Sequence, residues 1–523
     1  MKYVSRAPQK LKKHHIEMKR ISTYIFIYIA VLTLAACSRT AMVPESSSPV
    51  KEQAEIFPDY RDIIIPPNIA PLNIQVNSAG SNFAGTITAG SETIIAESGE
   101  NGKLFWNPEE WRALLEKSRG KDMTVQLYAE RDGAWVSFPS YKITVAQDTI
   151  DRYLSYRLIE PSYQLYRQMG LYQRDLETFE EFPIYENNRE FSDDENHCVN
   201  CHNFQNHSTK HMLFHIRGVH GGTLLGSEGK LERLKMTTDS TLGNAVYPSW
   251  HPSLNCVAFS SNDTGQAFHM LNKNKIEVID RKSDLIFFDA DNMTISNILK
   301  TNDHMETFPC WAPDGKTLYY CDADVTWLNA LPDSTHAENI VMNYDSLRYD
   351  LMRISFDPAT KTFGTPEKVV SCASQGMSAA VPRVSPDGRY IVYTRSPYGQ
   401  FHIWHSEADL WLYDIQTGED KPLDEVNSKD VDSYHSWSSN GRWIVVASRR
   451  IDGSYSRPFI AYFDRQGKAH KAFLLPQEDP EYNQLLMKSF NVPELTSDRV
   501  PYTPEQLKEV IYNDDAMKSV KYK

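Results

Sequence analysis

The chain lacks several features that would assign it to a common class of protein. None of its 523 residues lies in an uninterrupted apolar run of 18 or more, so the sequence predicts no permanent membrane-spanning helix. It has no nucleophile-elbow, phosphate-loop or zinc-protease motif, which favours an electron carrier or binding protein over a catalyst. It also lacks an excess of positive charge, since its formal net charge is −13. Because phosphate would repel so acidic a chain, we expect no nucleic-acid partner.

Basic residues are concentrated at the N-terminus. Residues 1–36 hold seven Lys and Arg and one acid, so residues 37–523 carry 48 − 67 = −19. An apolar run at residues 24–34 follows the basic stretch and ends in small residues and Cys37. That order is typical of a secretory signal.

The end of this run resembles the bacterial lipoprotein box. The resemblance implies that residues 1–37 are a signal peptide and lipobox, and that an acylated Cys37 anchors the chain in a membrane. By the family's sorting rules Ser38 implies the outer membrane, with the periplasmic or surface face undecided. Residues 38–57 are rich in Ser, Pro, Glu and Lys, and we expect them to form a flexible tether.

Residues 58–150 predict a β-sandwich-like domain. Short β-rich runs alternate with turns that contain Gly, and the triplet at residues 131–133, Arg-Asp-Gly, predicts a hairpin. One helix interrupts the strands, because Asn107 can cap it and Pro108 suits its first position.

Residues 151–210 have helical periodicity with clustered tyrosines, which predicts a small helical segment. This segment contains the pattern Cys-X-X-Cys-His at Cys198, Cys201 and His202, the attachment pattern of c-type haem. Two thiols add across the porphyrin vinyl groups, and the adjoining imidazole binds the iron. The sequence therefore predicts one covalent haem c, with Cys198 and Cys201 as anchors and His202 as the proximal ligand.

Two other interpretations of the Cys pair remain open. A thioredoxin-like redox pair needs lowered thiol pKa values, which the acidic residues 193–195 would raise instead. A zinc site could use Cys198, Cys201 and two of His197, His207, His211 and His215. The export signal favours haem, because it delivers the chain to the compartment where thioether attachment is performed.

The distal position of such a haem has several candidate ligands. Alternation over residues 211–216 predicts a strand with Met212, Phe214 and Ile216 on one face. Met212 is one candidate, and the others are His211, His215, Met169, Met487 or none. A Met ligand suits electron transfer, whereas an open position suits gas or peroxide chemistry.

Beyond residue 236 the chain repeats itself. Four similar segments begin at Tyr247, Phe308, Val381 and Tyr434. Each has Trp or Val three residues after its first residue, and in three of them an Asp-Gly or Asn-Gly turn follows. An apolar strand follows each segment, and the Trp or Val positions are 61, 73 and 53 residues apart. That spacing predicts a β-propeller whose Trp residues fill the wedges between blades. Residues 212–236 predict strands of a further blade, so we expect five blades, or six.

The repeats resemble those of TolB-like propellers, with their Ser-Pro-Asp-Gly turn. Together with the lipobox and the haem motif, the chain is similar to exported TolB-like lipoproteins with a cytochrome c domain. This resemblance implies a propeller over residues 211–480, with His202 just outside it.

Three smaller features complete the sequence. Cys310 and Cys321 flank one turn, so a disulfide or free thiols would both suit them, and Cys256 and Cys372 are unassigned. The loop at residues 402–409 holds His and acidic side chains, which we interpret as a blade edge rather than a metal site. In the tail, residues 481–523, Thr503 and Gln506 predict a capping box for a short helix.

The sequence therefore predicts a mainly β chain in three parts: a β-sandwich-like domain, a helical haem segment and a propeller. Two functions follow. The chain is either a membrane-tethered c-type cytochrome that presents its haem to a redox partner, or a non-haem scaffold that binds another protein.

Overall fold

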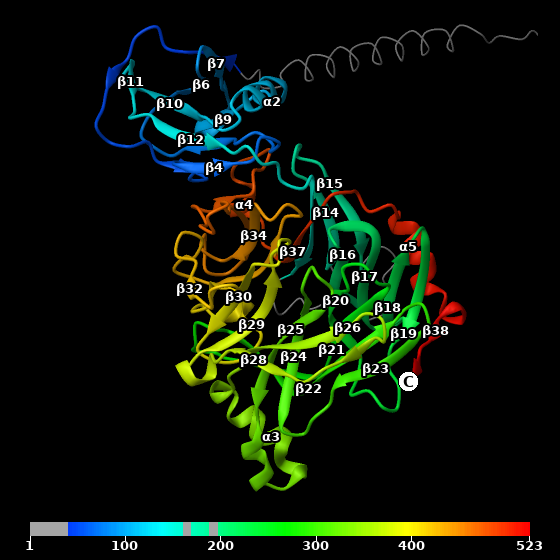
Figure 1. The fold of residues 1–523 in the computed structure, drawn as a ribbon. Coiled ribbons are helices and arrows are strands. Elements are labelled where there is room, and N and C mark those ends of the chain that lie inside the picture. The colour runs from blue at the N-terminus through cyan, green and yellow to red at the C-terminus, as the bar shows by residue number, and fades with distance from the viewer. Residues whose placement is uncertain (1–39, 161–168, 188–196) are drawn as a thin grey trace, which may run out of the picture.

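The structure is a computed structural model that describes residues 40–160, 169–187 and 197–523. Cys37 and the predicted signal lie outside the described residues. The mainly β architecture is confirmed, because strands make up most of the regular structure. Figure 1 shows the N-terminal domain, in blue and cyan, beside a larger body of sheets. Within the described ranges, no helix has the length and apolar composition needed to cross a membrane.

The N-terminal domain consists of two sheets and one helix that share an apolar core. The first sheet has the order β1 (Thr40–Ala41), β8 (Glu97–Ser98), β9 (Lys103–Phe105), β5 (Ile74–Val76) and β3 (Ile56–Phe57). The second has the order β2 (Ser48–Pro49), β11 (Ala134–Ser137), β10 (Asp122–Arg131), β12 (Tyr141–Val145) and β4 (Ile63–Ile65), with β6 (Phe83–Ala89) on β10 and β7 (Glu92–Ile95) on β6.

Local signals account for two elements of this domain. The β10–β11 hairpin closes between Arg131 and Ala134, where Gly133 takes a φ of 78° that its missing Cβ permits. Helix α2 (Pro108–Lys117) starts where predicted, and Asn107 Oδ1 accepts hydrogen bonds from the amides of Glu109 and Glu110.

The segment predicted as a flexible tether is instead part of this domain. Its short strands β1, β2 and β3 pair with β8, β11 and β5. The prediction was wrong for residues 40–57 because polar composition does not reveal a strand that pairs at the edge of an existing sheet.

Six antiparallel sheets fill the rest of the described chain, where the sequence predicted five blades or six. Each is given from its first, innermost strand outward. They are β37 (Ser489–Thr496), β13 (Tyr153–Ile159), β14 (Gly170–Asp175), β15 (Glu181–Glu186); β16 (His197–Gln205), β17 (Ser208–Gly218), β18 (Gly222–Ser227), β19 (Lys230–Lys235); β20 (Ala245–Trp250), β21 (Cys256–Phe268), β22 (Ile276–Asp289), β23 (Thr294–Leu299); β24 (His304–Trp311), β25 (Thr317–Asp324), β26 (Asp350–Asp357), with β27 (Thr362–Phe363) and β28 (Glu367–Val370); β29 (Ser378–Val384), β30 (Tyr390–Ser396), β31 (Asp409–Asp414), β32 (Asp420–Pro422); and β33 (Asp432–Trp437), β34 (Trp443–Ser448), β35 (Arg457–Tyr462), β36 (Phe473–Leu474).

The innermost strands contact one another in a ring, in the order β16, β20, β24, β29, β33, β37 and back to β16. The C-terminal part closes this ring, since β37 pairs with β13 from more than 300 residues earlier. The tail also adds β38 (Lys518–Ser519) to β19 and β39 (Lys521–Tyr522) to β23. Residues 481–523 are therefore an integral part of the sheets, which the predicted tail did not include.

The predicted helical haem segment at 151–210 is wrong for its described residues. They form strands β13 to β16, and the remaining residues, 161–168 and 188–196, lie outside the described chain. His202 consequently lies in the innermost strand β16 rather than outside the ring of sheets. The aromatic spacing was compatible with a helix, but long-range pairing with β37 and β17 decides the structure.

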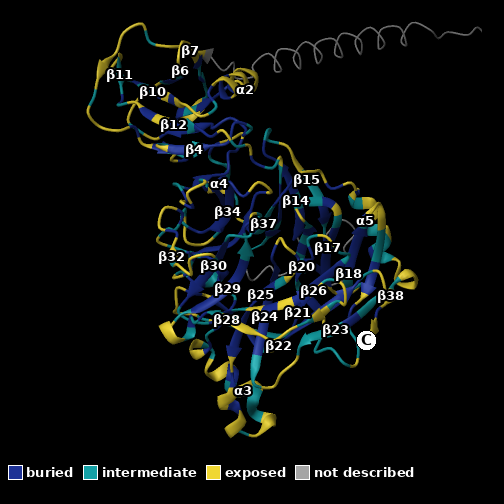
Figure 2. Cartoon of the chain, in the orientation of Figure 1, coloured by how far each residue is buried: buried dark blue, intermediate teal, exposed yellow. Residues whose placement is uncertain are grey.

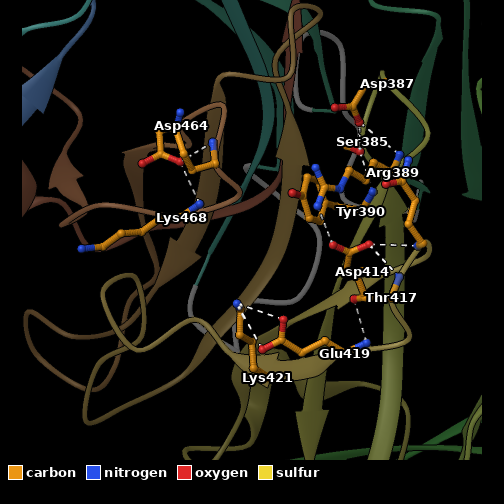
Figure 3. A network of polar contacts seen from close by, with 12 residues as sticks. Ser385, Asp387, Arg389, Tyr390, Asp414, Thr417, Glu419, Lys421, Asp464 and Lys468 are labelled. Atoms are coloured by element: carbon orange, nitrogen blue, oxygen red, sulfur yellow. Dashed lines mark hydrogen bonds and ion pairs between the residues drawn. The ribbon is translucent and has the colours of Figure 1, made fainter.

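Side-chain hydrogen bonds close the repeated turn in its third copy. Ser385 Oγ donates to Asp387 Oδ1 and accepts from the amide of Tyr390, while Gly388 takes a φ of 72° (Figure 3). In the first copy, which lacks Asp-Gly, the His251 ring accepts from two backbone amides and closes the turn instead.

Helices lie outside the ring. They are α3 (His336–Met342), which contacts β22, α4 (Tyr482–Leu485), and α5 (Pro504–Tyr512), whose predicted capping box is present. One apolar cluster runs from the N-terminal domain into the sheets of β29 and β33, so the domain is packed against the body. Figure 2 shows buried residues along the strands and exposed ones mainly at turns and around α3.

Candidate functional site

A cavity of about 350 Å³ lies where the innermost strands meet. Residues from all six of these strands line it, together with the end of β13 and the long β21–β22 hairpin. A second cavity of about 170 Å³ shares His202 with the first. The ring of strands therefore encloses an axial channel, and the haem motif lies on its wall.

Each innermost strand carries one bulge at the same place. The six bulge residues are not glycines, yet they have φ values between 48° and 53°: Cys201, Tyr247, Phe308, Val381, Tyr434 and Val492. Such backbone is uncommon for residues with a Cβ, and a bulge redirects the side chain of its strand. The repeat thus extends to residues 201–204 and 492–495, where the sequence alignment had not placed it.

Hydrogen bonds connect the bulges around the ring. At four of the six junctions a side chain accepts from a backbone amide of the neighbouring sheet; the pairs are Asn203 and Trp250, Ser249 and Trp311, Ser436 and Leu495, and Glu494 and Phe204. These bonds tie adjacent sheets together at the axis, so the backbone around His202 is held on both sides.

The structure brings the two motif thiols to one cavity. Cys198 is buried, and Cys201 lies at the bulge three residues further along the strand. The side-chain Nδ2 of Asn200 donates to Cys198 Sγ at 3.0 Å. Burial raises the pKa of Cys198, although Arg217 and Arg157 oppose that shift. A raised pKa disfavours a thioredoxin-like redox pair, which needs a thiolate at neutral pH.

His202 is buried with neither ring nitrogen hydrogen-bonded to any described residue. Its nearest carboxylate is Glu494, whose Oε2 lies 3.9 Å from Nε2. Burial lowers the pKa of His202 to about 3, with smaller contributions from Arg157 and Arg383, and the backbone of Val492 opposes that shift. The imidazole is therefore neutral at pH 7, with a lone pair available to a metal. Burial raises the pKa of Glu494 to about 7.

The residues predicted as distal ligands differ in whether they line the cavity. Met169 lines the cavity. Met212 does not, because it packs with Phe214 and Ile216 in an apolar cluster on the predicted strand face. His211 contacts Trp250 and Ser227, and His215 is buried outside the cavity wall. Met487 is exposed.

The zinc alternative gains no support from the described residues, among which no group of three or more His, Cys, Asp or Glu is arranged to hold a metal. His197, for example, packs against Tyr185 and Tyr512. Of the two alternatives for Cys310 and Cys321 the structure has the free thiols, since Cys310 faces Tyr319 and Cys321 faces Thr307.

Sequence reasoning missed two groups of cavity residues. Arg157 and Arg383 line the wall, and so do the aromatic side chains of Tyr247, Phe308 and Tyr434. The aromatic residues begin the repeats, so the repeat register could have found them. No nearby sequence motif identifies Arg157 as a cavity residue, because it lies in a segment predicted as helix.

The loop at residues 402–409 is largely buried, so the prediction of a half-exposed edge was wrong. His405 is buried, with one nitrogen 2.9 Å from Glu277 Oε2 and the other 3.0 Å from Ser396 Oγ. This network holds the loop against the β21–β22 hairpin beside the cavity.

No protein-family model matches the chain, and no curated protein matches its sequence. Among solved structures it is similar to TolB from Acinetobacter baumannii, with a TM-score of 0.40 and 13% identity over 71% of this chain and 78% of that one. It is also similar to the tricorn protease, with a TM-score of 0.34 and 11% identity over 78% of this chain and 37% of that one. A DUF4784 family protein from Bacteroides caccae has a TM-score of 0.27 and 9% identity over 86% of this chain and 98% of that one.

Proposed function

We propose that the chain is an exported, lipid-anchored electron carrier with one haem c in the axial channel of a six-bladed propeller. Cys198 and Cys201 would form the thioether bonds, and His202 would be the proximal iron ligand. The observation that carries the proposal is that all three side chains line one cavity, in which the His202 imidazole is buried without a hydrogen-bond partner among the described residues.

The surroundings fit a porphyrin. When bound, haem supplies an iron that gains and loses one electron. The chain's own part is to hold His202 neutral, to fix the backbone of β16 through the ring of bulges, and to exclude water with aromatic walls. Met169 is the thioether that reaches the same cavity, so it is our choice for the distal ligand in place of Met212.

Anchoring and docking complete the proposal. Cys37 would carry the lipid that holds the acidic body at the outer membrane. Half of the exposed large apolar side chains of the described chain lie on the β21–β22 tip and the 326–346 insertion: Phe268, Met270, Leu271, Trp327, Val341 and Met342. The rings of His269 and Tyr344 are in contact and connect these two segments, and the strand residues next to the hairpin tip, 264–266, 276 and 278, line the cavity. This surface is where we place the redox partner.

A haem stain after denaturing electrophoresis tests the proposal. The chain is produced with its signal in a host that performs c-type maturation, because attachment needs that machinery. We expect colour in the wild type, loss of colour in Cys198→Ala, and retention in the matched control Cys256→Ala, a buried thiol away from the cavity.

Mass analysis of the peptide that contains Cys198 and Cys201 gives the decisive result. Unmodified thiols in mature protein would overturn the haem proposal. The chain would then be a tethered propeller scaffold, the second function that the sequence allowed.

A further inference from the structure

We infer that the axial cavity is a carboxylate-binding site, in which Arg157 and Arg383 pair with the anionic groups of a flat apolar ligand. The inference rests on the proposed function only for the identity of that ligand. The carboxylates come either from the propionates of a bound haem or from a free aromatic acid, and the chemistry of recognition is the same.

Arg157 is a cation without a counterion among the described residues. Its Nη1 donates to the carbonyl of Val199 at 3.3 Å and its Nη2 to Asn491 Oδ1 at 3.1 Å. Its Nε has no partner among the described residues, and no described carboxylate forms an ion pair with it. Burial lowers the pKa of Arg157, which means that the protein stabilises its charge poorly. A desolvated guanidinium is costly unless an anion pairs with it.

Arg383 is the second such cation. It lies at the bulge of β29, two residues after Val381, and its Nη1 donates to the carbonyl of Pro382 at 2.9 Å. It forms no ion pair within the described ranges either, although Glu494 is close enough for Arg383 to lower the pKa of that carboxyl. Arg157 and Arg383 both contribute to lowering the pKa of His202 and oppose the rise in the pKa of Tyr434, so both lie near the same groups in the cavity.

Glu160, the acid among the described residues of the lining, already pairs with Lys488 at 3.0 Å, so it does not neutralise Arg157 or Arg383. Guanidinium groups present paired donors that match a carboxylate, which makes such pairs strong.

The rest of the wall defines the body of the ligand. Tyr247, Phe308, Tyr434 and Trp404 contribute aromatic faces, and Ile276 and Val278 contribute aliphatic ones. Ligand sites of this composition take flat apolar molecules, and a small number of polar groups fixes their orientation. The carboxylates would thus lie at the guanidiniums while the ring system contacts the aromatic wall.

The test uses the full mature chain with Cys198→Ser and Cys201→Ser, so that no ligand is attached covalently. It is titrated with haemin and with haemin dimethyl ester, which lacks the carboxylate charges, and with 2-naphthoate and 2-naphthamide as free-ligand probes. We expect each acid to bind about tenfold more tightly than its uncharged partner, since a hydrogen bond to a charged group contributes on the order of 1.4 kcal/mol or more.

Arginine variants assign that preference. Arg383→Gln and Arg157→Gln should each reduce the ratio of acid to neutral affinity towards one, while Arg353→Gln, an exposed arginine paired with Glu367, should keep it. Because Arg157 also bonds the backbone, Arg157→Lys serves if the glutamine variant fails to fold, and it should give an intermediate ratio.

The outcomes separate the two proposals. Binding of naphthoate but not haemin, with dependence on both arginines, supports the carboxylate site and counts against haem. Tight binding of haemin and its ester with equal affinity, unchanged in the arginine variants, overturns the carboxylate site and leaves the haem proposal intact. Binding of none of the four probes also overturns the site.

Discussion

Replacing His215 by leucine should make the protein more resistant to acid. His215 lies in β17, is 2% exposed, and has neither ring nitrogen bonded to a described residue. Burial lowers its pKa from 6.5 to about 3, with a smaller contribution from Arg217. Leucine removes two unpartnered polar atoms while keeping an apolar side chain in the same space. We therefore expect a gain of about 1 kcal/mol in the free energy of unfolding at pH 7.5.

The larger effect appears in acid. Because the folded pKa lies below the unfolded one, the unfolded state binds more protons between pH 3 and 6.5, and stability is lost as pH falls through that window. At pH 5 a pKa of about 3 against 6.5 costs the wild type about 2 kcal/mol. His402 and His435 also have pKa values lowered to about 3. Each adds about 1.4 kcal/mol per pH unit, so the variant's acid midpoint should fall by roughly half to one pH unit.

Acid titration followed by tryptophan fluorescence measures this midpoint, with urea unfolding at pH 7.5 as the companion measurement. His211→Leu is the matched control on the same strand, since that imidazole is 21% exposed and bonded to Ser227. It should leave the midpoint in place. An unchanged midpoint in His215→Leu, or a loss of stability at pH 7.5, would refute the reasoning and indicate that the imidazole has a native hydrogen-bond partner.

Two further predictions concern stability. Burial, followed by Asp322 and Asp284, raises the pKa of Glu306 to about 8, so the free energy of unfolding falls as pH rises from 4.5 towards 8. Glu306→Gln should reduce this fall between pH 5 and 8 by about 3 kcal/mol in urea titrations, and an identical fall in both proteins would contradict the assigned cause. Asn107→Ala removes the acceptor for two amides of α2 and should destabilise the N-terminal domain by about 1 kcal/mol, seen by calorimetry as a lower unfolding temperature.

Features with a local cause could be predicted from the sequence. The hairpin at Gly133, the helix that Asn107 caps and the capping box of Thr503 each depend on a few neighbouring residues. The strand alternation around Met212 was also correct, because burial on one face of a strand has a period of two.

Features that depend on pairing with distant parts of the chain could not be predicted from the sequence. Strand β13 exists because β37 pairs with it from the far end of the chain, and a clustered-tyrosine spacing cannot report that pairing. The same holds for Arg157, whose neighbours in the cavity come from β16 and β37. The choice of Met212 over Met169 failed for a related reason, since sequence proximity to His202 does not determine which side chains share its cavity.

The ring contains an internal comparison that bears on the haem proposal. His435 occupies the position in β33 that His202 occupies in β16, directly after the bulge residue, and burial lowers the pKa of both to about 3. His435 nevertheless has a hydrogen bond, with Nε2 2.8 Å from the carbonyl of Val392. The fold can therefore provide a well-formed hydrogen bond at this position, whereas His202 only approaches the backbone of Val492 and forms no hydrogen bond of good geometry with a described residue. Burying an imidazole without such a bond costs free energy, and coordination to the iron of a haem attached through Cys198 and Cys201 would offset that cost.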